Sequence, residues 1–309
     1  MRVMCVAPNW LLPFFDGEKI TYRFVGSLKE GFEPQPLFDY STGEVFEPFQ
    51  VGCGKCLDCI QLHKIEWIHR IQDEASLYKD NAFITLTYHN SLKNSETVVS
   101  KETARIFIRE LRRAIYPRKI RYYLCGEYGS KRGRAHYHAV IFNYSFPDKR
   151  FFKFDKKGFP IYRSDFLESI WNPRFIPYAG FSGISNVCEK TLEYVTKDMQ
   201  KMQYTYTDCE DVQRPDPFVL MSLKPGIGAR AAPVDVPADG RIWHEGKSVL
   251  LPRYYKKLLV RQGKEKEVAL FNKKLAAISD LRQIYSDPDL DLQKYEKKSR
   301  DLLDKKKIL

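Results

Sequence analysis

The sequence has no apolar run that approaches the roughly 20 residues needed for a transmembrane helix. Its first residues, MRVMCVAPNWLLPFF, are interrupted by Pro8 and Pro13 and followed by no small-residue cleavage site, so we expect no signal peptide. It has no internal repeat and no low-complexity tract. Acidic side chains are comparatively few: 39 Asp and Glu face 51 Lys and Arg, which gives a net charge of +12. This excess predicts a polyanionic partner, either nucleic acid or an anionic membrane surface.

The length of 309 residues allows two domains, or one large domain with extensions. We predict three regions: a Cys-rich N-terminal segment over 1–60, a central domain over 61–213, and an extended arm with a basic helical region over 214–309. Seven cysteines are an odd number, and three of them lie in CGKCLDC. That clustering favours metal binding in a reducing cytoplasm over a disulfide framework.

The central region alternates β-branched, aromatic segments with amphipathic ones. Strands are predicted over 82–88, 120–129 and 136–142, and helices from about Ile60, over 101–115, over 165–171 and over 188–203. Closely spaced strands with helices between them indicate an α+β fold, with a central antiparallel sheet and helices on one face.

The sequence His136-Tyr137-His138 lies in the strand predicted over 136–142. Because strand side chains alternate, both imidazoles point to one face and can bind one cation. Pairing with the preceding strand would bring Glu127 beside them. Two His and one carboxylate suit Mg²⁺ or Mn²⁺ at a phosphoryl substrate. The alternative is a chance His-x-His pair on an exposed strand.

Tyr194 and Lys197 are three residues apart in a predicted helix, so they are neighbours on its surface. A tyrosine hydroxyl is a poor nucleophile at its usual pKa, and a nearby ammonium group would help it react. The alternative is a surface tyrosine beside a solvated lysine.

Basic residues precede the histidine pair. Residues 101–134 hold 11 Lys and Arg against 3 Asp and Glu. Lys131, Arg132 and Arg134 lie next to the predicted cation site, as expected for a phosphate backbone entering it. Interleaved tyrosines are able to stack unpaired bases. A solvated basic helix with core tyrosines is the competing interpretation.

Cys53, Cys56 and Cys59 are spaced as ligands of a structural zinc ion. Tetrahedral zinc needs a fourth ligand, for which Cys5 is our candidate and His63 the competing one. Reduced cysteines without a metal near a helix start are the alternative.

Several segments in order resemble the replication initiation proteins of gokushovirus-type microviruses, which belong to the HUH endonucleases. They are CGKCLDC, FITLTY, CGEYG, RAHYHAVIF, EYVTKDMQK, PGIG and LPRYYKK. Together they cover roughly residues 53–257. The resemblance implies the HUH nuclease fold, with a ferredoxin-like core, in the host bacterial cytoplasm.

The resemblance also implies roles for single residues. His136 and His138 match the HUH pair, Glu127 the third ligand of a catalytic Mg²⁺ or Mn²⁺, Tyr194 the nucleophile, and Lys197 the lysine of the YxxK motif. The implied reaction is nicking and joining of single-stranded DNA at the phage origin. It passes through a 5′-phosphotyrosyl intermediate and leaves a 3′-OH primer.

One departure concerns the second half of this reaction. Asp198 stands where two-tyrosine relatives carry a second tyrosine, so a second copy, or one tyrosine acting after turnover, would have to complete the transfer. The oligomeric state is open, and a host helicase or polymerase is a possible partner. Two alternatives are kept: a non-enzymatic zinc-containing nucleic-acid-binding protein, and a relaxase or transposase of the HUH group.

Overall fold

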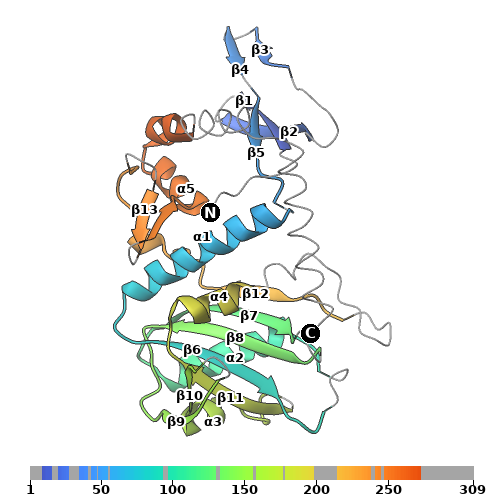
Figure 1. Ribbon diagram of the computed structural model, residues 1–309, viewed down its shortest axis with the longest axis vertical. Coiled ribbons are helices and arrows are strands. Elements are labelled where there is room, and N and C mark those ends of the chain that lie inside the picture. Colours follow the sequence, from blue (N-terminus) through green and yellow to red (C-terminus); the bar gives the residue numbers. More distant parts are fainter. Residues whose placement is uncertain are drawn as a thin grey trace. The chain divides into compact units, whose positions relative to one another are not determined.

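The computed structural model describes residues 9–15, 20–27, 35–40, 43–46, 48–54, 56–92, 97–129, 133–155, 158–176, 178–197, 214–237, 241–244 and 247–272. These fall into two compact units, one ending at His63 and the other beginning at Lys64 (Figure 1). None of the helices within these ranges is long and apolar enough to cross a membrane.

The N-terminal unit is built from short strands. β2 (Ile20–Ser27), β1 (Asn9–Phe15) and β5 (Phe49–Val51) form one sheet in that order, and β3 (Leu37–Asp39) pairs with β4 (Glu44–Phe46) in a hairpin. Helix α1 (Leu57–Ser76) begins in this unit and continues into the second one.

The second unit contains a seven-stranded sheet in the order β12-β7-β8-β6-β11-β10-β9, and every neighbouring pair is antiparallel. Its strands are β6 (Asn81–Tyr88), β7 (Arg121–Tyr128), β8 (Ala135–Phe142), β9 (Arg150–Phe154), β10 (Pro160–Arg163), β11 (Ala179–Ser185) and β12 (Phe218–Met221). The predicted α+β fold with a central antiparallel sheet is therefore confirmed.

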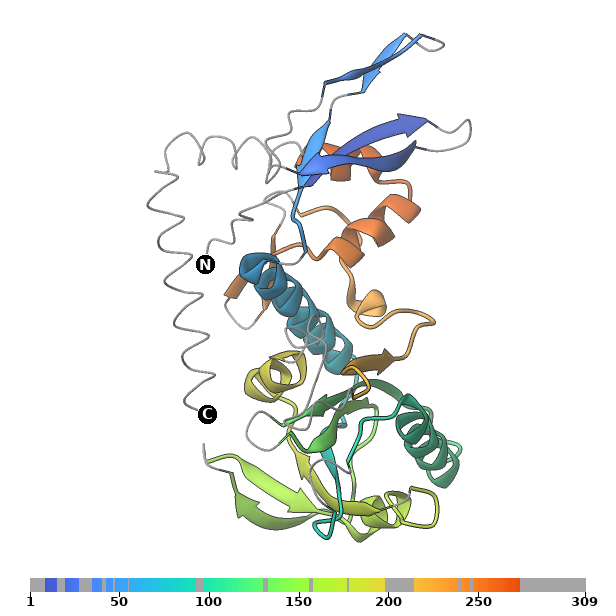
Figure 2. The same cartoon turned by 90° about the vertical axis from the view of Figure 1, so that its right-hand side faces the viewer.

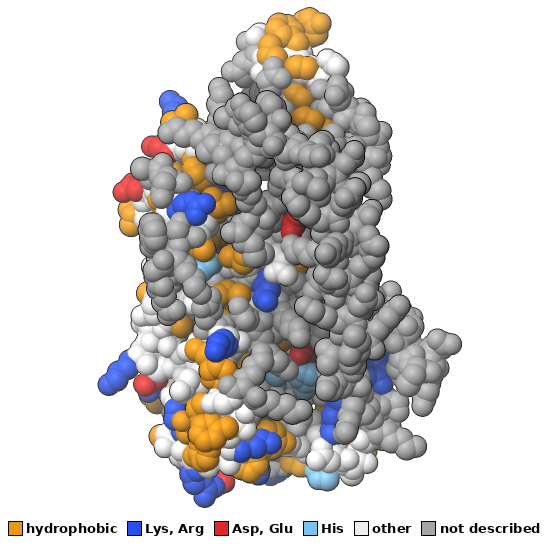
Figure 3. Space-filling view, in the orientation of Figure 1, with side chains coloured by type: hydrophobic (Ala, Val, Ile, Leu, Met, Phe, Trp, Pro, Cys, Tyr) orange, Lys and Arg blue, Asp and Glu red, His pale blue; other side chains and the backbone are white. Residues whose placement is uncertain are grey.

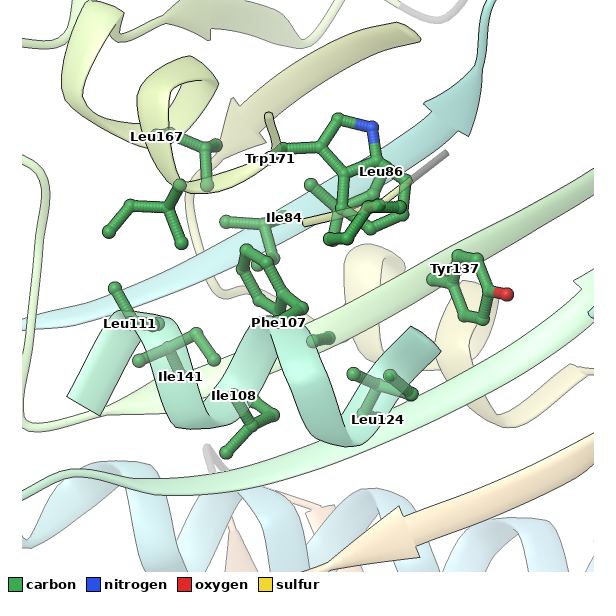
Figure 4. Packing of buried hydrophobic residues seen from close by; sticks show 14 of the residues in the cluster. Ile84, Leu86, Phe107, Ile108, Leu111, Leu124, Tyr137, Ile141, Leu167 and Trp171 are labelled. Atoms are coloured by element: carbon green, nitrogen blue, oxygen red, sulfur yellow. The ribbon is translucent and has the colours of Figure 1, made fainter. Parts of the chain in front are cut away.

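One face of this sheet packs against α2 (Lys101–Ala114) and α3 (Asp165–Ile170) (Figure 4). The Ser100 side chain caps α2 by accepting a hydrogen bond from the Thr103 amide. The helix then buries Phe107, Ile108 and Leu111 at three- and four-residue steps. Burial of each such side chain contributes about 1.5–3 kcal/mol, so this face anchors the sheet.

The opposite face packs against the C-terminal part of α1 and against α4 (Glu189–Lys197) (Figures 1 and 2). Ile71 of α1 and Leu192 and Val195 of α4 join Phe83 and Val140 of the sheet in one buried cluster. The prediction that helices lie on one face was wrong. Each helix has an apolar stripe, but chain order does not reveal which face that stripe covers.

Two strands of the sheet were not predicted. β11 has the sequence AGFSGIS, which is poor in strand-forming residues, yet it pairs with β6 at the centre of the sheet. β12 lies within the Pro- and Gly-rich stretch interpreted as an arm, and it pairs with β7.

The chain after β12 folds back onto α1. The Arg70 guanidinium lies between the rings of Trp67 and Tyr254, 3.9 and 4.0 Å from their centroids, and donates to the Ile227 carbonyl. Glu74, fully buried, accepts from Arg121 at 2.6 Å and from the Gly228 amide at 2.8 Å. β13 (Arg241–His244), β14 (Lys247–Leu250) and α5 (Arg253–Arg261) follow. The PGIG and LPRYYKK segments thus hold α1 in place.

Candidate metal and DNA-processing site

The sheet register brings the His-x-His pair beside Glu127. His136 lies opposite Glu127 on β7 and opposite Thr87 on β6, and His138 lies opposite Cys125 and Thr85. Both imidazoles share one face, with ring centroids 4.8 Å apart. It is the face on which α4 packs, because the His138 ring stacks on Phe83 at 5.6 Å.

Each imidazole is oriented through its Nδ1 atom. His136 Nδ1 lies 3.0 Å from the Arg134 carbonyl oxygen, and His138 Nδ1 lies 2.9 Å from the Thr85 hydroxyl. With Nδ1 donating in both rings, each Nε2 is left to bind a cation, as is typical of metal-binding histidines. Both Nε2 atoms converge on Glu127 Oε1, at 2.5 Å from His136 and 3.2 Å from His138.

The Glu127 carboxyl is buried, at 2% exposure. Burial alone would raise its pKa, but the hydrogen bonds from His136 and His138 outweigh this effect, and the pKa lies well below its usual range. Glu127 is therefore an anion at neutral pH and a ready cation ligand.

The donor set fits a divalent metal. The ligand atoms of Glu127, His136 and His138 lie within 4.8 Å of one another. Two neutral imidazoles and one carboxylate satisfy part of a coordination sphere and leave positions for substrate oxygen and water. The geometry does not distinguish Mg²⁺ from Mn²⁺.

Tyr194 and Lys197 lie on α4. This helix packs through Leu192 and Val195 on the face of the sheet that carries His138. The helix and the histidine pair are thus on one side of the sheet, although 56 positions separate His138 from Tyr194 in the sequence. Asp198 lies outside the described residues.

The predicted basic loop is described only in part, because Lys131 and Arg132 lie outside the described residues. The Arg134 guanidinium donates to Asn90 Oδ1 at 2.6 Å and to the carbonyl oxygens of Tyr88 and His89. Arg134 therefore ties the end of β6 to the start of β8, next to His136.

A second group of metal-binding side chains lies in the N-terminal unit. The Sγ atoms of Cys53, Cys56 and Cys59 are within 4.8 Å of one another, and the Cys56 amide donates to Cys53 Sγ at 3.3 Å. Gly54 allows this tight turn with a φ of 75°. Three thiolates suit zinc, which takes four ligands. Cys5 lies outside the described residues.

Thr85 is a site residue that the sequence interpretation missed. It belongs to FITLTY, in which Phe83, Thr85 and Thr87 alternate with larger apolar side chains. A threonine on the face shared with a His-x-His strand was the available signal, but the pairing of β6 with β8 was needed to use it.

Comparison with known proteins connects this geometry to replication. Residues 81–203 match a family model for replication-associated proteins of the ORF2 type. Replication-associated protein ORF4 of Chlamydia phage 1 is 26% identical over 61% of this chain and 50% of its own length. Replication-associated protein VP4 of Bdellovibrio phage phiMH2K is 28% identical, over 47% and 49%. Replication-associated protein ORF2 of Spiroplasma virus 4 is 31% identical, over 58% and 61%.

These matches confirm the resemblance to the replication proteins of small single-stranded DNA phages. The chain spans between about half and three fifths of the length of these curated relatives. No solved structure gives a significant match.

Proposed function

From this relationship to phage replication-associated proteins, we propose that the chain is a rolling-circle replication initiator that nicks and rejoins single-stranded DNA at the phage origin. The observation that carries the proposal is the convergence of His136, His138 and Glu127 on the sheet face against which α4 packs. A non-enzymatic nucleic-acid-binding protein would not need this arrangement.

In the proposed reaction the Tyr194 oxygen attacks the scissile phosphorus. The new bond joins that oxygen to the 5′ phosphate, the bond from phosphorus to the 3′ oxygen breaks, and the 3′ oxygen takes up a proton to become the primer hydroxyl. A divalent ion held by His136, His138 and Glu127 supplies positive charge at the phosphate when it is bound. Lys197 stabilises the charge that develops in the transition state.

The remaining assignments complete the proposal. Lys131, Arg132 and Arg134 contact DNA phosphates, and Arg134 also holds the loop after β6. Joining needs a second nucleophile, and with Asp198 after Lys197 we assign it to a second copy or to the same tyrosine after turnover. Host helicase or polymerase contacts and a location in the host cytoplasm follow from the same function.

The test is covalent capture of single-stranded origin DNA with Mn²⁺ present. We expect wild-type protein to form a DNA-linked band on a denaturing gel, and His138→Ala to lose it because one of two imidazole ligands is gone. A surviving band in His138→Ala, or an equal yield in the presence of a chelator, contradicts the proposed metal dependence. Tight DNA binding without any adduct favours the zinc-containing binding protein.

A further inference from the structure

The sheet face that carries the histidines continues beyond them toward β9. Thr85, which bonds His138, lies opposite Gly183 on β11. A Cβ atom at Gly183 would lie 3.2 Å from the Phe181 ring and 3.3 Å from Ile161. Phe181 and Ile161 are therefore on the same face as the histidine pair, two and three strands away from β8.

An aromatic and cationic group covers this part of the face. The Arg163 guanidinium lies 5.4 Å from the Phe181 ring centroid and 5.5 Å from that of Phe152, and the two rings are 5.8 Å apart. Lys153 adds a second cation 5.3 Å from the Phe152 ring. We call these four residues the Phe152 cluster. In Figure 3, hydrophobic and basic side chains lie together over the part of the sheet labelled β9–β11 in Figure 1.

A cavity of about 420 Å³ adjoins the Phe152 cluster. It is lined by His89, Asn90, Arg163, Ala179, Gly180 and Phe181. Asn90 accepts a hydrogen bond from Arg134, whose carbonyl oxygen in turn accepts from His136. The cavity and the histidine pair are therefore connected through a single residue, Arg134.

The chemistry of this surface matches unpaired nucleotides. Phe152 is 44% exposed although it is a large apolar side chain, and two cations lie beside it. Exposed rings next to Arg and Lys provide base stacking together with phosphate attraction. Four strand spacings of about 4.8 Å place β9 about 19 Å from β8, a distance that a few nucleotides span.

We propose that the Phe152 cluster is a subsite that stacks one unpaired base of single-stranded DNA, a few nucleotides from the scissile phosphate. The inference deepens the proposed function and rests on it for the identity of the substrate. It assigns a positioning role to a hairpin that carries none of the predicted catalytic residues.

The first test compares two neighbouring phenylalanines of β9. Phe151 is 55% exposed, and its ring contacts Phe154 and Tyr162; Tyr162 packs against the α2 side of the sheet. We expect Phe152→Ala to weaken binding of a fluorescent single-stranded oligonucleotide about 5- to 10-fold in an anisotropy titration. Phe151→Ala should bind within twofold of wild type. Equal affinities in the two variants would overturn the subsite. Thermal melting of both confirms that each one folds.

The second test places the contact on the DNA. A series of oligonucleotides carries one abasic site, moved one position at a time from the cleavage point. Wild type should lose affinity at one position, and Phe152→Ala should show no further loss there. A uniform response along the strand overturns the subsite.

The same samples separate the two proposals. Covalent adduct formation with unchanged affinity in Phe152→Ala leaves the nicking function standing and removes the subsite. A position-specific loss of affinity without any adduct leaves the subsite standing and removes the proposed chemistry.

Discussion

Among single residues, Thr85 controls the orientation of His138. Its hydroxyl lies 2.9 Å from His138 Nδ1, whereas the Thr87 hydroxyl, two residues along the same strand, donates to the Phe181 carbonyl instead. The two threonines share a face and differ in the group that each one holds. They therefore separate orientation of the imidazole from the general effect of losing a hydroxyl.

We predict that Thr85→Val weakens Mn²⁺ binding about 10- to 100-fold, the usual effect of removing a partner that orients a metal ligand. Titration calorimetry with Mn²⁺ measures this directly. Thr87→Val is the matched control and should bind Mn²⁺ as wild type does. Equal affinities in the two variants would mean that the Thr85 hydroxyl does not set the His138 ring.

Residue identity also explains which site residues the sequence revealed. His136, His138 and Glu127 were predicted to lie together because strand alternation and a short connection fix their geometry locally. The Phe152 cluster was not predicted, because Phe181, Arg163 and Phe152 come from three strands. The aromatic, Lys-rich composition of residues 146–163 was visible in the sequence, but its place on the sheet depended on the pairing of β10 with β11.

Among the elements, the segment after β12 meets α1 at unusually close range. Gly228 has a φ of 78°, and a Cβ atom there would meet the Tyr255 hydroxyl and lie 2.9 Å from the Arg70 carbonyl oxygen. Gly158, in the turn before β10, has a φ of 80° with nothing within 4 Å of the same position. The two glycines share a backbone conformation and differ in the space around them.

We predict that Gly158→Ala costs about 1–2 kcal/mol of unfolding free energy, the cost of a left-handed conformation for alanine. Gly228→Ala should cost about 1–3 kcal/mol more, because the methyl group also displaces packed neighbours. Urea denaturation measures both values. Equal losses would show that the segment does not pack as closely on α1 as the structure indicates.

Local pattern predicted most elements, and tertiary context supplied the others. The predicted segments 82–88, 101–115 and 136–142 agree with β6, α2 and β8 because their periodicity and capping residues act locally. β11 is rich in Gly and Ser, and it becomes a strand because β6 and β10 flank it.

For the molecule as a whole, the division into two units separates the two candidate metal sites. The Cys53, Cys56 and Cys59 group lies in the N-terminal unit, whereas the histidine pair lies in the second unit. Thiolates favour zinc, and the imidazole and carboxylate set accepts harder ions. The two sites should therefore respond to metals and chelators independently.

We predict one zinc ion per chain, held by Cys53, Cys56 and Cys59. Cys59→Ser should lose it, because the binding energy of structural zinc depends on every thiolate. Cys188→Ser, a half-buried cysteine in the second unit, is the control and should keep it. Elemental analysis of the purified variants gives the zinc content. Cys5→Ser and His63→Ala, measured in the same way, identify the fourth ligand, and wild-type protein without zinc would contradict the assignment.

The most direct test of the central claim is the identity of the residue that becomes linked to DNA. Labelled single-stranded origin DNA is incubated with protein and Mn²⁺, and the denatured products are resolved on a gel and analysed by mass spectrometry. Tyr116, 84% exposed, provides a control tyrosine. Wild type and Tyr116→Phe should form an adduct that maps to Tyr194, and Tyr194→Phe should bind DNA without forming one. An adduct that persists in Tyr194→Phe, or that maps to another residue, would contradict the account.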